Sequence, residues 1–290
     1  MDRLRSECLS CIIKNHIEKF PKETEEQQKV KYMQEVFQIL SHAKSTESAP
    51  VIVHKINEIQ EEMFHMTNEY TEIKKYFNQV MMGYETKIKE QLRSCEDPLK
   101  LAIQYSMIGN YIDFGAMKNV DEEYLTNLLN GAKDNPVNEE SYRCLKHDLE
   151  NGENLVFLTD NCGEIVMDKL LIFVLKEKYP KLHITVIVRG EAVLNDATME
   201  DAIQTGLTDL VEVIGNGNGI AGTCIDELSE EAFHKVEKAD VILSKGQGNF
   251  ETLRKCGKNV YYIFLCKCDM FANIFGVEKF TGMLVNDKDC

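Results

Sequence analysis

Tryptophan is absent from this 290-residue chain, and proline occurs only five times. Long apolar runs are also missing: the longest, such as Leu170–Leu175, span six residues, whereas a membrane-spanning helix needs about 20. No stretch has low complexity. These absences exclude a fibrous, disordered or membrane-embedded protein. A hydrophobic content of 43% over this length is sufficient for a substantial core.

Positive charge is scarce as well. The chain has 33 Lys and Arg residues against 48 Asp and Glu residues, a net charge of −15. No cluster of basic residues with interleaved aromatics occurs. We therefore expect no nucleic-acid or membrane partner, because both require a basic patch. A metal cation, or a small anionic substrate in a local cationic pocket, remains compatible with this charge.

The N-terminal residues 1–7 are polar and lack the apolar region of a secretory signal. We therefore expect a cytoplasmic protein in which the ten cysteines are mostly reduced thiols. Cys8 and Cys11 are spaced like a redox pair or half of a zinc site, but no second pair follows. Buried free thiols are the favoured interpretation. The sequence gives no indication of oligomeric state.

The two halves of the chain differ in composition. Residues 1–150 contain 4 glycines and residues 151–290 contain 13. Apolar residues at three- and four-residue spacing predict helices over Lys31–Leu40 and Val51–Phe64. We predict a helical N-terminal region over 1–150 that covers the functional site, followed by an α/β domain over 151–290.

Short runs rich in Val and Ile alternate with helical patterns in the second half. This alternation predicts a three-layer sandwich with a mostly parallel, Rossmann-like sheet covered on both faces. The predicted strands are Leu155–Leu158, Ile184–Val188, Val211–Ile214, Val241–Leu243 and Val260–Leu265.

Polar or glycine-rich segments follow all five predicted strands. Asp160 and Asn161 follow the first, Arg189 and Asp196 the second, and Lys245 the fourth. In an open parallel sheet, ligands bind at this edge. Carboxylate and amide oxygens suit Mg²⁺ or Mn²⁺. Taken singly, each acidic motif is better explained as a helix cap or a turn.

Two glycine-containing loops allow more than one interpretation. Lys245 and Gly246 precede a predicted helix, an arrangement that can bind phosphate, although a tight turn with a solvated lysine fits equally. Residues 217–222 satisfy Gly-x-Gly-x-x-Gly. This is a weak dinucleotide signature here because it follows the third strand and no helix begins at once. A flexible loop over a substrate, or the cofactor loop of an S-adenosylmethionine-dependent carboxyl methyltransferase, remains an alternative.

Taken together and in order, the motifs resemble the damage-control phosphatase family, formerly a domain of unknown function, in its stand-alone prokaryotic form. The matching pieces are Arg5-x-x-Cys8-x-x-Cys11, Gly109-Asn110-x-Ile112-Asp113, Asp160-Asn161-x-Gly163-Glu164, Arg189-Gly190, Asn195-Asp196-Ala197-Thr198, Lys245-Gly246-x-Gly248-Asn249-x-Glu251 and Lys267-Cys268. Part of the wider family has been named as a protein-glutamate methyltransferase, so that alternative stays open.

The resemblance implies a divalent metal (Mn, Mg, Co or Ni) held by Asp160, Asn161 and Asp196, and hydrolysis of small phosphorylated metabolites such as sugar phosphates. We expect catalysis to depend on these three residues and on Lys245. Whether Asp160 is a nucleophile or only a ligand stays open. The residues expected to bind substrate are Asn110, Asp113, Gly163, Glu164, Arg189, Gly246, Asn249 and Glu251. We expect Lys245 and the amides of Gly163 and Gly246 to contact phosphate. A non-catalytic metal or redox protein built on Cys8 and Cys11 is the second alternative.

Overall fold

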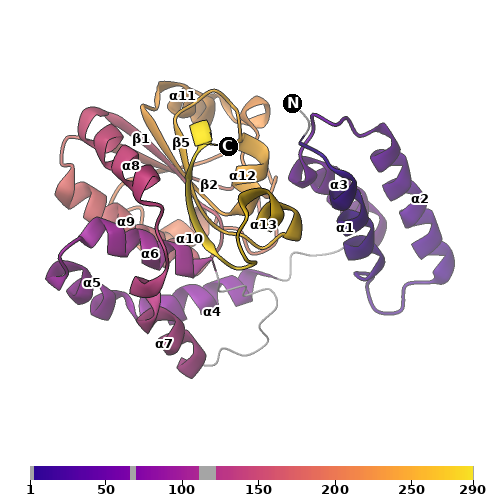
Figure 1. The fold of residues 1–290 in the computed structure, drawn as a ribbon. Coiled ribbons are helices and arrows are strands. Elements are labelled where there is room, and N and C mark those ends of the chain that lie inside the picture. Colours follow the sequence, from indigo (N-terminus) through magenta and orange to yellow (C-terminus); the bar gives the residue numbers. More distant parts are fainter. Residues whose placement is uncertain (1–2, 66–69, 111–121, 290) are drawn as a thin grey trace.

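A six-stranded sheet forms the centre of the computed structural model, which describes residues 3–65, 70–110 and 122–289 (Figure 1). The strand order is β3-β2-β1-β4-β5-β6, with β1 to β5 parallel and β6 antiparallel to β5. The strands are β1 (Asn154–Leu158), β2 (His183–Val188), β3 (Glu212–Gly215), β4 (Val241–Lys245), β5 (Val260–Leu265) and β6 (Gly282–Asn286).

Period-two alternation along the strands produces two apolar faces. Phe157 and Leu243 point into one core, whereas Val156 and Ile242 point into the other. Helices α4 to α10 cover the first face: α4 (Tyr70–Met82), α5 (Glu85–Ser94), α6 (Pro98–Gly109), α7 (Glu122–Asn130), α8 (Glu139–Asn151), α9 (Glu164–Lys178) and α10 (Met199–Gln204). The second face is covered by α11 (Glu230–Lys238), α12 (Gln247–Leu253) and α13 (Asp269–Phe275). The expected three-layer α/β architecture is confirmed.

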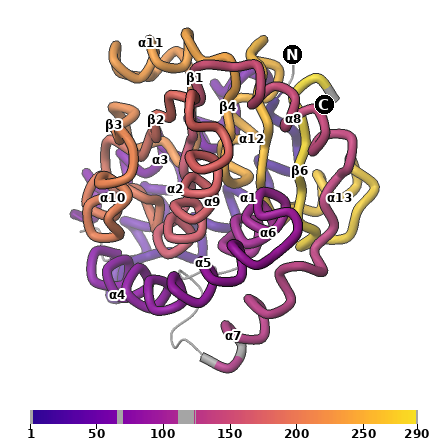
Figure 2. The backbone as a smooth tube through the Cα atoms, turned by 90° about the vertical axis from the view of Figure 1, so that its left-hand side faces the viewer, coloured from indigo at the N-terminus to yellow at the C-terminus, as the bar shows by residue number. Residues whose placement is uncertain are grey.

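The remaining helices form a small lobe with its own core. They are α1 (Ser6–Ile17), α2 (Glu26–His42) and α3 (Ala49–Phe64). This lobe lies on the α12 side of the sheet, opposite α9 (Figures 1 and 2). Arg3 joins it to the larger part by donating hydrogen bonds to the carbonyls of Thr252 and Arg254. The helical first half is thus divided, because α4 to α8 share their core with the sheet.

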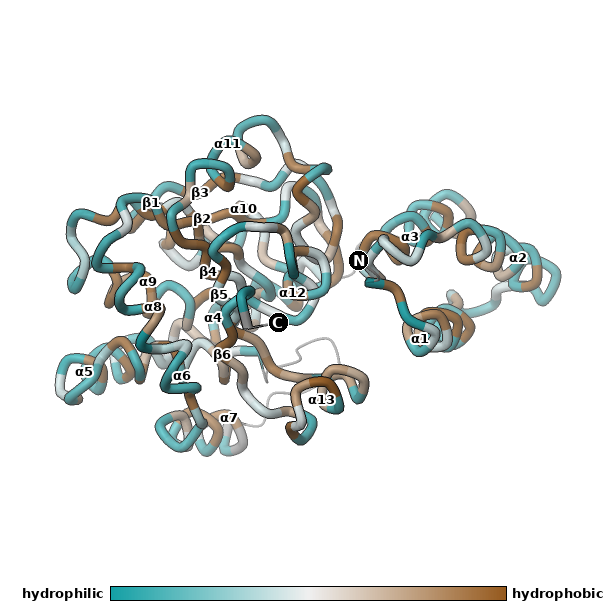
Figure 3. Tube along the Cα trace, turned by 45° about the horizontal axis from the view of Figure 1, so that its top comes forward, coloured by the Kyte–Doolittle hydropathy of each residue, from teal (hydrophilic) through white to brown (hydrophobic). Residues whose placement is uncertain are grey.

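All five strands that the sequence predicts are present, and β6 is an additional strand that its pattern did not indicate. Apolar residues concentrate along the strands in Figure 3, as expected for a sheet buried on both faces. Within the described residues, no helix is long and apolar enough to cross a membrane.

The strand order creates a topological switch point between β1 and β4. The chain leaves β1 toward β2 on one side, then returns after β3 to place β4 on the other side. Loops leaving the carboxyl ends of β1 and β4 therefore diverge, and ligands bind at such a point in open α/β sheets. Asp160 and Gly246 lie at this point.

Candidate functional site

The loops after β1 and β2 are joined side by side. Their strands are parallel neighbours, so both loops leave the same edge of the sheet. Asn161 and Asp196 form an isolated antiparallel bridge. The Ala197 amide donates to the Asp160 carbonyl at 2.7 Å, and the Cys162 amide donates to the Asn195 carbonyl at 2.8 Å. The three predicted metal ligands are thereby brought together.

Arg189 connects the two carboxylates of the site. Its Nε donates to Asp196 Oδ2 at 2.7 Å, and its Nη2 lies 3.8 Å from Asp160 Oδ1. The side chain is almost wholly buried, and Nη1 donates to Asn249 Oδ1 at 3.3 Å. Nη2 has no hydrogen-bond partner among the described residues. A buried guanidinium N–H with no partner beside two carboxylates is suited to an incoming anionic oxygen.

The second oxygen of Asp160 is occupied by amides. Asp160 Oδ2 accepts from Asn110 Nδ2 at 2.9 Å and from Asn161 Nδ2 at 2.7 Å. Asn110 directly follows α6, so the helical half does contribute to the site. Its Nδ2 also donates to Glu164, and its Oδ1 accepts from the Leu265 amide at 3.2 Å. The polar atoms of Asn110 are thus engaged by Asp160, Glu164 and Leu265, so this predicted substrate-binding residue supports Asp160.

Three oxygens of the site accept no hydrogen bond from the described part of the chain: Asp160 Oδ1, Asn161 Oδ1 and Asp196 Oδ1. Burial, reinforced by the charges of Asp196 and Glu164, raises the pKa of Asp160 to about 7. Burial also raises the pKa of Asp196, against the opposing effect of Arg189. Clustered carboxylates whose charged forms are disfavoured, next to an amide oxygen, fit a hard divalent cation, which would offset their repulsion.

Gly246 fits closely against Asp160. Its φ is +80°, and a Cβ at this position would overlap the carboxylate, lying 2.5 Å even from Oδ1. The Gly246 amide donates to the Ile263 carbonyl at 3.0 Å. The Gly163 amide donates to Asn78 Oδ1 at 2.6 Å. Both amides expected to contact phosphate are therefore already bonded to protein, because their segments turn here from strand to helix and pack tightly.

Lys245 differs from expectation in a similar way. Its side chain is fully buried, and its ammonium donates to the Ser106 carbonyl at 3.0 Å, to Asp168 at 2.9 Å and to Glu164. The three ammonium hydrogens are thus engaged by protein acceptors. Glu164 is fully buried as well, so neither side chain is exposed to solvent.

Asn249 and Glu251, two further residues expected to bind substrate, make hydrogen bonds within the protein. Asn249 is buried and its Nδ2 donates to the carbonyls of Thr159 and Lys245, so it holds the ends of β1 and β4 together. Glu251 accepts from Gln247 at 2.8 Å. Asp113 lies outside the described residues.

Lys267 is a cation that the site predictions missed. It follows β5, is partly buried, and its charge lowers the pKa of Asp160. No ion pair of its ammonium occurs among the residues that the structure describes. Its place at the end of a strand of the same sheet, together with the Lys267-Cys268 motif, is the signal that could have identified it.

Asp168 was also missed, because helical periodicity alone places it with surface carboxylates. Burial, together with the charge of Glu164 and against that of Lys245, raises the pKa of Asp168 to about 7. Its Oδ2 is buried without a partner among the described atoms. When the pKa of a carboxyl is higher in the folded protein than in the unfolded chain, its protonated form favours the folded state at low pH. This contribution to the free energy of unfolding is lost as pH rises through the folded pKa.

We therefore expect Asp168→Asn to become more favourable for stability as pH rises from 5 to 8. At pH 5 folded Asp168 is protonated and resembles asparagine; at pH 8 it carries a disfavoured charge. Thermal unfolding of metal-free wild type and variant should show their melting temperatures diverging by a few degrees in the variant's favour. A constant difference would contradict the assigned environment.

The glycines of residues 217–222 are explained by packing. A Cβ on Gly190 would lie 2.5 Å from the Gly217 amide nitrogen, and one on Gly222 would lie 2.7 Å from the Thr252 side chain. These contacts bring the loops after β2 and β3 against each other and against α12. A dinucleotide site has an acidic residue that binds ribose after the strand following its glycine-rich loop. Here that strand is β4, and it ends in Lys245, so the described residues of this loop and strand do not favour a nucleoside cofactor.

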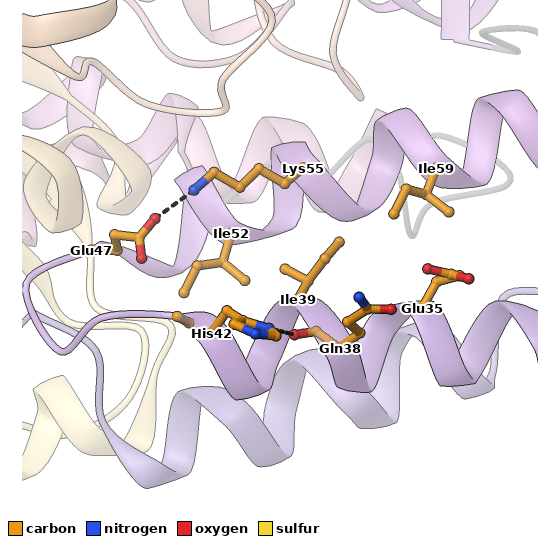
Figure 4. A pocket seen from close by; sticks show the side chains of 9 residues that line it. Glu35, Gln38, Ile39, His42, Glu47, Ile52, Lys55 and Ile59 are labelled. Atoms are coloured by element: carbon orange, nitrogen blue, oxygen red, sulfur yellow. Dashed lines mark hydrogen bonds and ion pairs between the residues drawn. The ribbon is translucent and has the colours of Figure 1, made fainter.

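A separate groove of about 380 Å³ lies between α2 and α3 (Figure 4). Ile39 and Ile52 line it, with the Lys55–Glu47 ion pair at one end. It contains none of the predicted site residues.

Cys8 is partly buried with a pKa raised by burial, and Cys11 is exposed. Across the described residues, no three His, Cys, Asp or Glu side chains gather into a metal-binding group. A cation at the sheet edge would therefore require the Asn161 amide.

Comparison with known proteins gives consistent results. An uncharacterised protein of Methanocaldococcus jannaschii is 29% identical over 299 residues, which cover 98% of this chain and 95% of the relative. A damage-control phosphatase of Archaeoglobus fulgidus is 32% identical over 243 residues, covering 81% and 83%. A damage-control phosphatase of Pyrococcus horikoshii is 32% identical over 216 residues, covering 71% and 74%.

The crystal structure of a DUF89 family protein from Pyrococcus horikoshii has the same fold, with a TM-score of 0.84 over 99% of both chains at 24% identity. The model of the damage-control phosphatase ARMT1-like domain matches residues 4–282. Since this match spans nearly the whole chain, and relatives carrying the family's name are 32% identical to it, the chain belongs to the ARMT1-like damage-control phosphatase domain family.

Proposed function

We propose that this protein is a divalent-metal-dependent phosphatase that hydrolyses phosphomonoesters of small metabolites, such as sugar phosphates. One observation carries the proposal. Asp160 and Asp196, from adjacent loops at the switch point, share Arg189, and one oxygen of each accepts no hydrogen bond from the described residues, next to the Asn161 amide. Family membership supports the same reaction class.

Asp160, Asn161 and Asp196 would hold the cation through those oxygens. When bound, a divalent cation supplies Lewis-acid polarisation of phosphate and offsets transition-state charge. Arg189 presents Nη2, which has no hydrogen-bond partner in the described ranges, to a phosphate oxygen while Nε keeps Asp196 in place. Lys267 provides a second positive charge at the same edge. These local cations allow an anionic substrate to bind despite the net charge of −15.

The amides of Asn110 and Asn161 stabilise the charged form of Asp160 at Oδ2 and leave Oδ1 for the proposed cation. Gly246, with no Cβ, allows the β4–α12 turn to close over that carboxylate. Both contacts restrict the Asp160 carboxylate to one orientation. Such rigidity favours a preorganised site, because little reorganisation is then needed during reaction.

The function is tested by metal removal and restoration. Treatment with a chelator should abolish phosphate release from p-nitrophenyl phosphate and fructose 1-phosphate. Mn²⁺, Mg²⁺, Co²⁺ or Ni²⁺, added singly after removal of the chelator, should restore it to different degrees. Undiminished turnover in excess chelator, or no turnover with any of the ions across a panel of phosphorylated metabolites, would overturn the proposal.

A further inference from the structure

We infer that Lys245 and Glu164 are a buried positioning pair: Lys245 neutralises Glu164, and Glu164 holds the Asn161 and Asn110 amides in the orientation that the site requires. Lys245 then acts on the cation site through Glu164, without touching substrate. The inference rests on the proposed metal-dependent phosphatase function, because the orientation at issue is that of Asn161 toward a cation.

The two oxygens of Glu164 have separate partners. Oε2 accepts from Asn110 Nδ2 and from Asn161 Nδ2, each at 2.9 Å. The same two nitrogens donate to Asp160 Oδ2, so two carboxylates and two amides form a closed ring. An amide has its N–H groups at one end and its carbonyl oxygen at the other. Binding the Asn161 N–H groups into this ring therefore directs its Oδ1 away from the ring, as a metal ligand requires.

Oε1 of Glu164 is bound by the Lys245 ammonium. With the ammonium at Oε1 and the two asparagine N–H groups at Oε2, the Glu164 carboxylate meets donors at both oxygens and accepts at both.

The fold is built closely around this pair. A Cβ on Gly109 would lie 3.0 Å from Glu164 Cγ and 3.2 Å from its Cα, so glycine lets the end of α6 approach Glu164 without displacing it. This approach brings Asn110, the next residue, into the ring. Asp168 and the Ser106 carbonyl hold the far side of the Lys245 ammonium at 2.9 and 3.0 Å. The pair is thus fixed from α6, β4 and α9.

The arrangement predicts strong coupling between the two residues. Lys245→Met alone leaves Glu164 and Asp168 buried without their counterion, which is costly. When Glu164→Gln is added, the glutamine carbonyl still accepts from both asparagine amides, and its own N–H groups can donate toward Asp168. The defect of Lys245→Met should therefore shrink in the Glu164→Gln background. If Lys245 bound phosphate instead, its loss would cost the same in both backgrounds.

The experiment compares the wild type with K245M, E164Q and the E164Q/K245M double variant. The first readout is the Mn²⁺ dissociation constant, measured by calorimetric titration without substrate. The second is kcat and KM for p-nitrophenyl phosphate at saturating Mn²⁺. We expect K245M to weaken Mn²⁺ binding by about 10- to 100-fold, as loss of support for a metal ligand does. The double variant should recover most of this loss, and kcat should change more than KM.

Lys169→Met is the matched control. Lys169 is also mostly buried on α9, where it pairs with Glu85 at 2.7 Å and donates to the Thr205 carbonyl, away from the ring. Its loss should lower thermal stability and leave the Mn²⁺ dissociation constant unchanged. A weakened Mn²⁺ affinity in this control would show that the K245M effect is general and would overturn the inference.

Equal Mn²⁺ and kinetic defects for Lys245→Met in both backgrounds would overturn the inference, as would unchanged Mn²⁺ affinity with a raised KM. If K245M alone does not fold, E164Q/K245M is compared with E164Q: similar Mn²⁺ affinity supports the pair, and lost affinity overturns it. Wild-type protein that binds none of Mn²⁺, Mg²⁺, Co²⁺ and Ni²⁺ would overturn the proposed function and this inference together. Mn²⁺ binding by the wild type with no rescue overturns the inference alone.

Discussion

Asp160→Ala should reduce phosphatase turnover by about a thousandfold or more, because the variant lacks the carboxylate that we propose as a metal ligand. The fold should survive. Since burial and the neighbouring carboxylates raise the pKa of Asp160 to about 7, its charged form is disfavoured in the folded protein. The metal-free variant should therefore melt no lower than metal-free wild type at pH 8. Turnover of p-nitrophenyl phosphate and thermal unfolding provide the two measurements.

Asp240→Ala is a suitable control for that variant. Asp240 precedes β4 at the opposite end of the sheet and accepts from the amides of Glu153 and Asn154, each at 2.9 Å. Its removal should cost stability and leave turnover near wild type. A folded Asp160→Ala protein that retained near-wild-type turnover would show that the reacting site lies elsewhere.

Gly246→Ala should lower turnover by about 100-fold or more, since a catalytic group displaced by about 1 Å loses that much. The added Cβ would overlap the Asp160 carboxylate, which must then move. Two adverse effects combine here, because a φ of +80° is also unfavourable for alanine. Steady-state kinetics and Mn²⁺ titration should both show the displacement.

Gly257→Ala separates the two effects. Gly257 has nearly the same φ, +81°, but a Cβ there would meet no atom within 4 Å. It should therefore show only the backbone penalty, about 1–2 kcal/mol in the free energy of unfolding, with normal kinetics. Equal kinetic defects in both alanine variants would contradict the close approach of Gly246 to Asp160.

The local pattern of apolar and polar residues was sufficient to predict the strands, the parallel sheet and the edge at which the candidate site lies. The Val- and Ile-rich runs, such as Val260–Leu265, predicted five strands because a strand buried on both faces must be apolar throughout. Their alternation with helices predicted a parallel sheet, and a parallel sheet brings its carboxyl-end loops to one edge. Asp160, Asn161 and Asp196 could therefore be placed together from the sequence.

What each side chain does at that edge was decided by tertiary structure. Sequence could not show that Lys245 would be met by Glu164 and Asp168 from α9, or that Asn110 would arrive from α6, because these contacts join segments 50 to 139 residues apart. A lysine after a strand looks the same whether its ammonium faces a crevice or a buried carboxylate. Burial and the partners available in three dimensions distinguish the two, since a buried charge persists only where an opposite charge is held beside it.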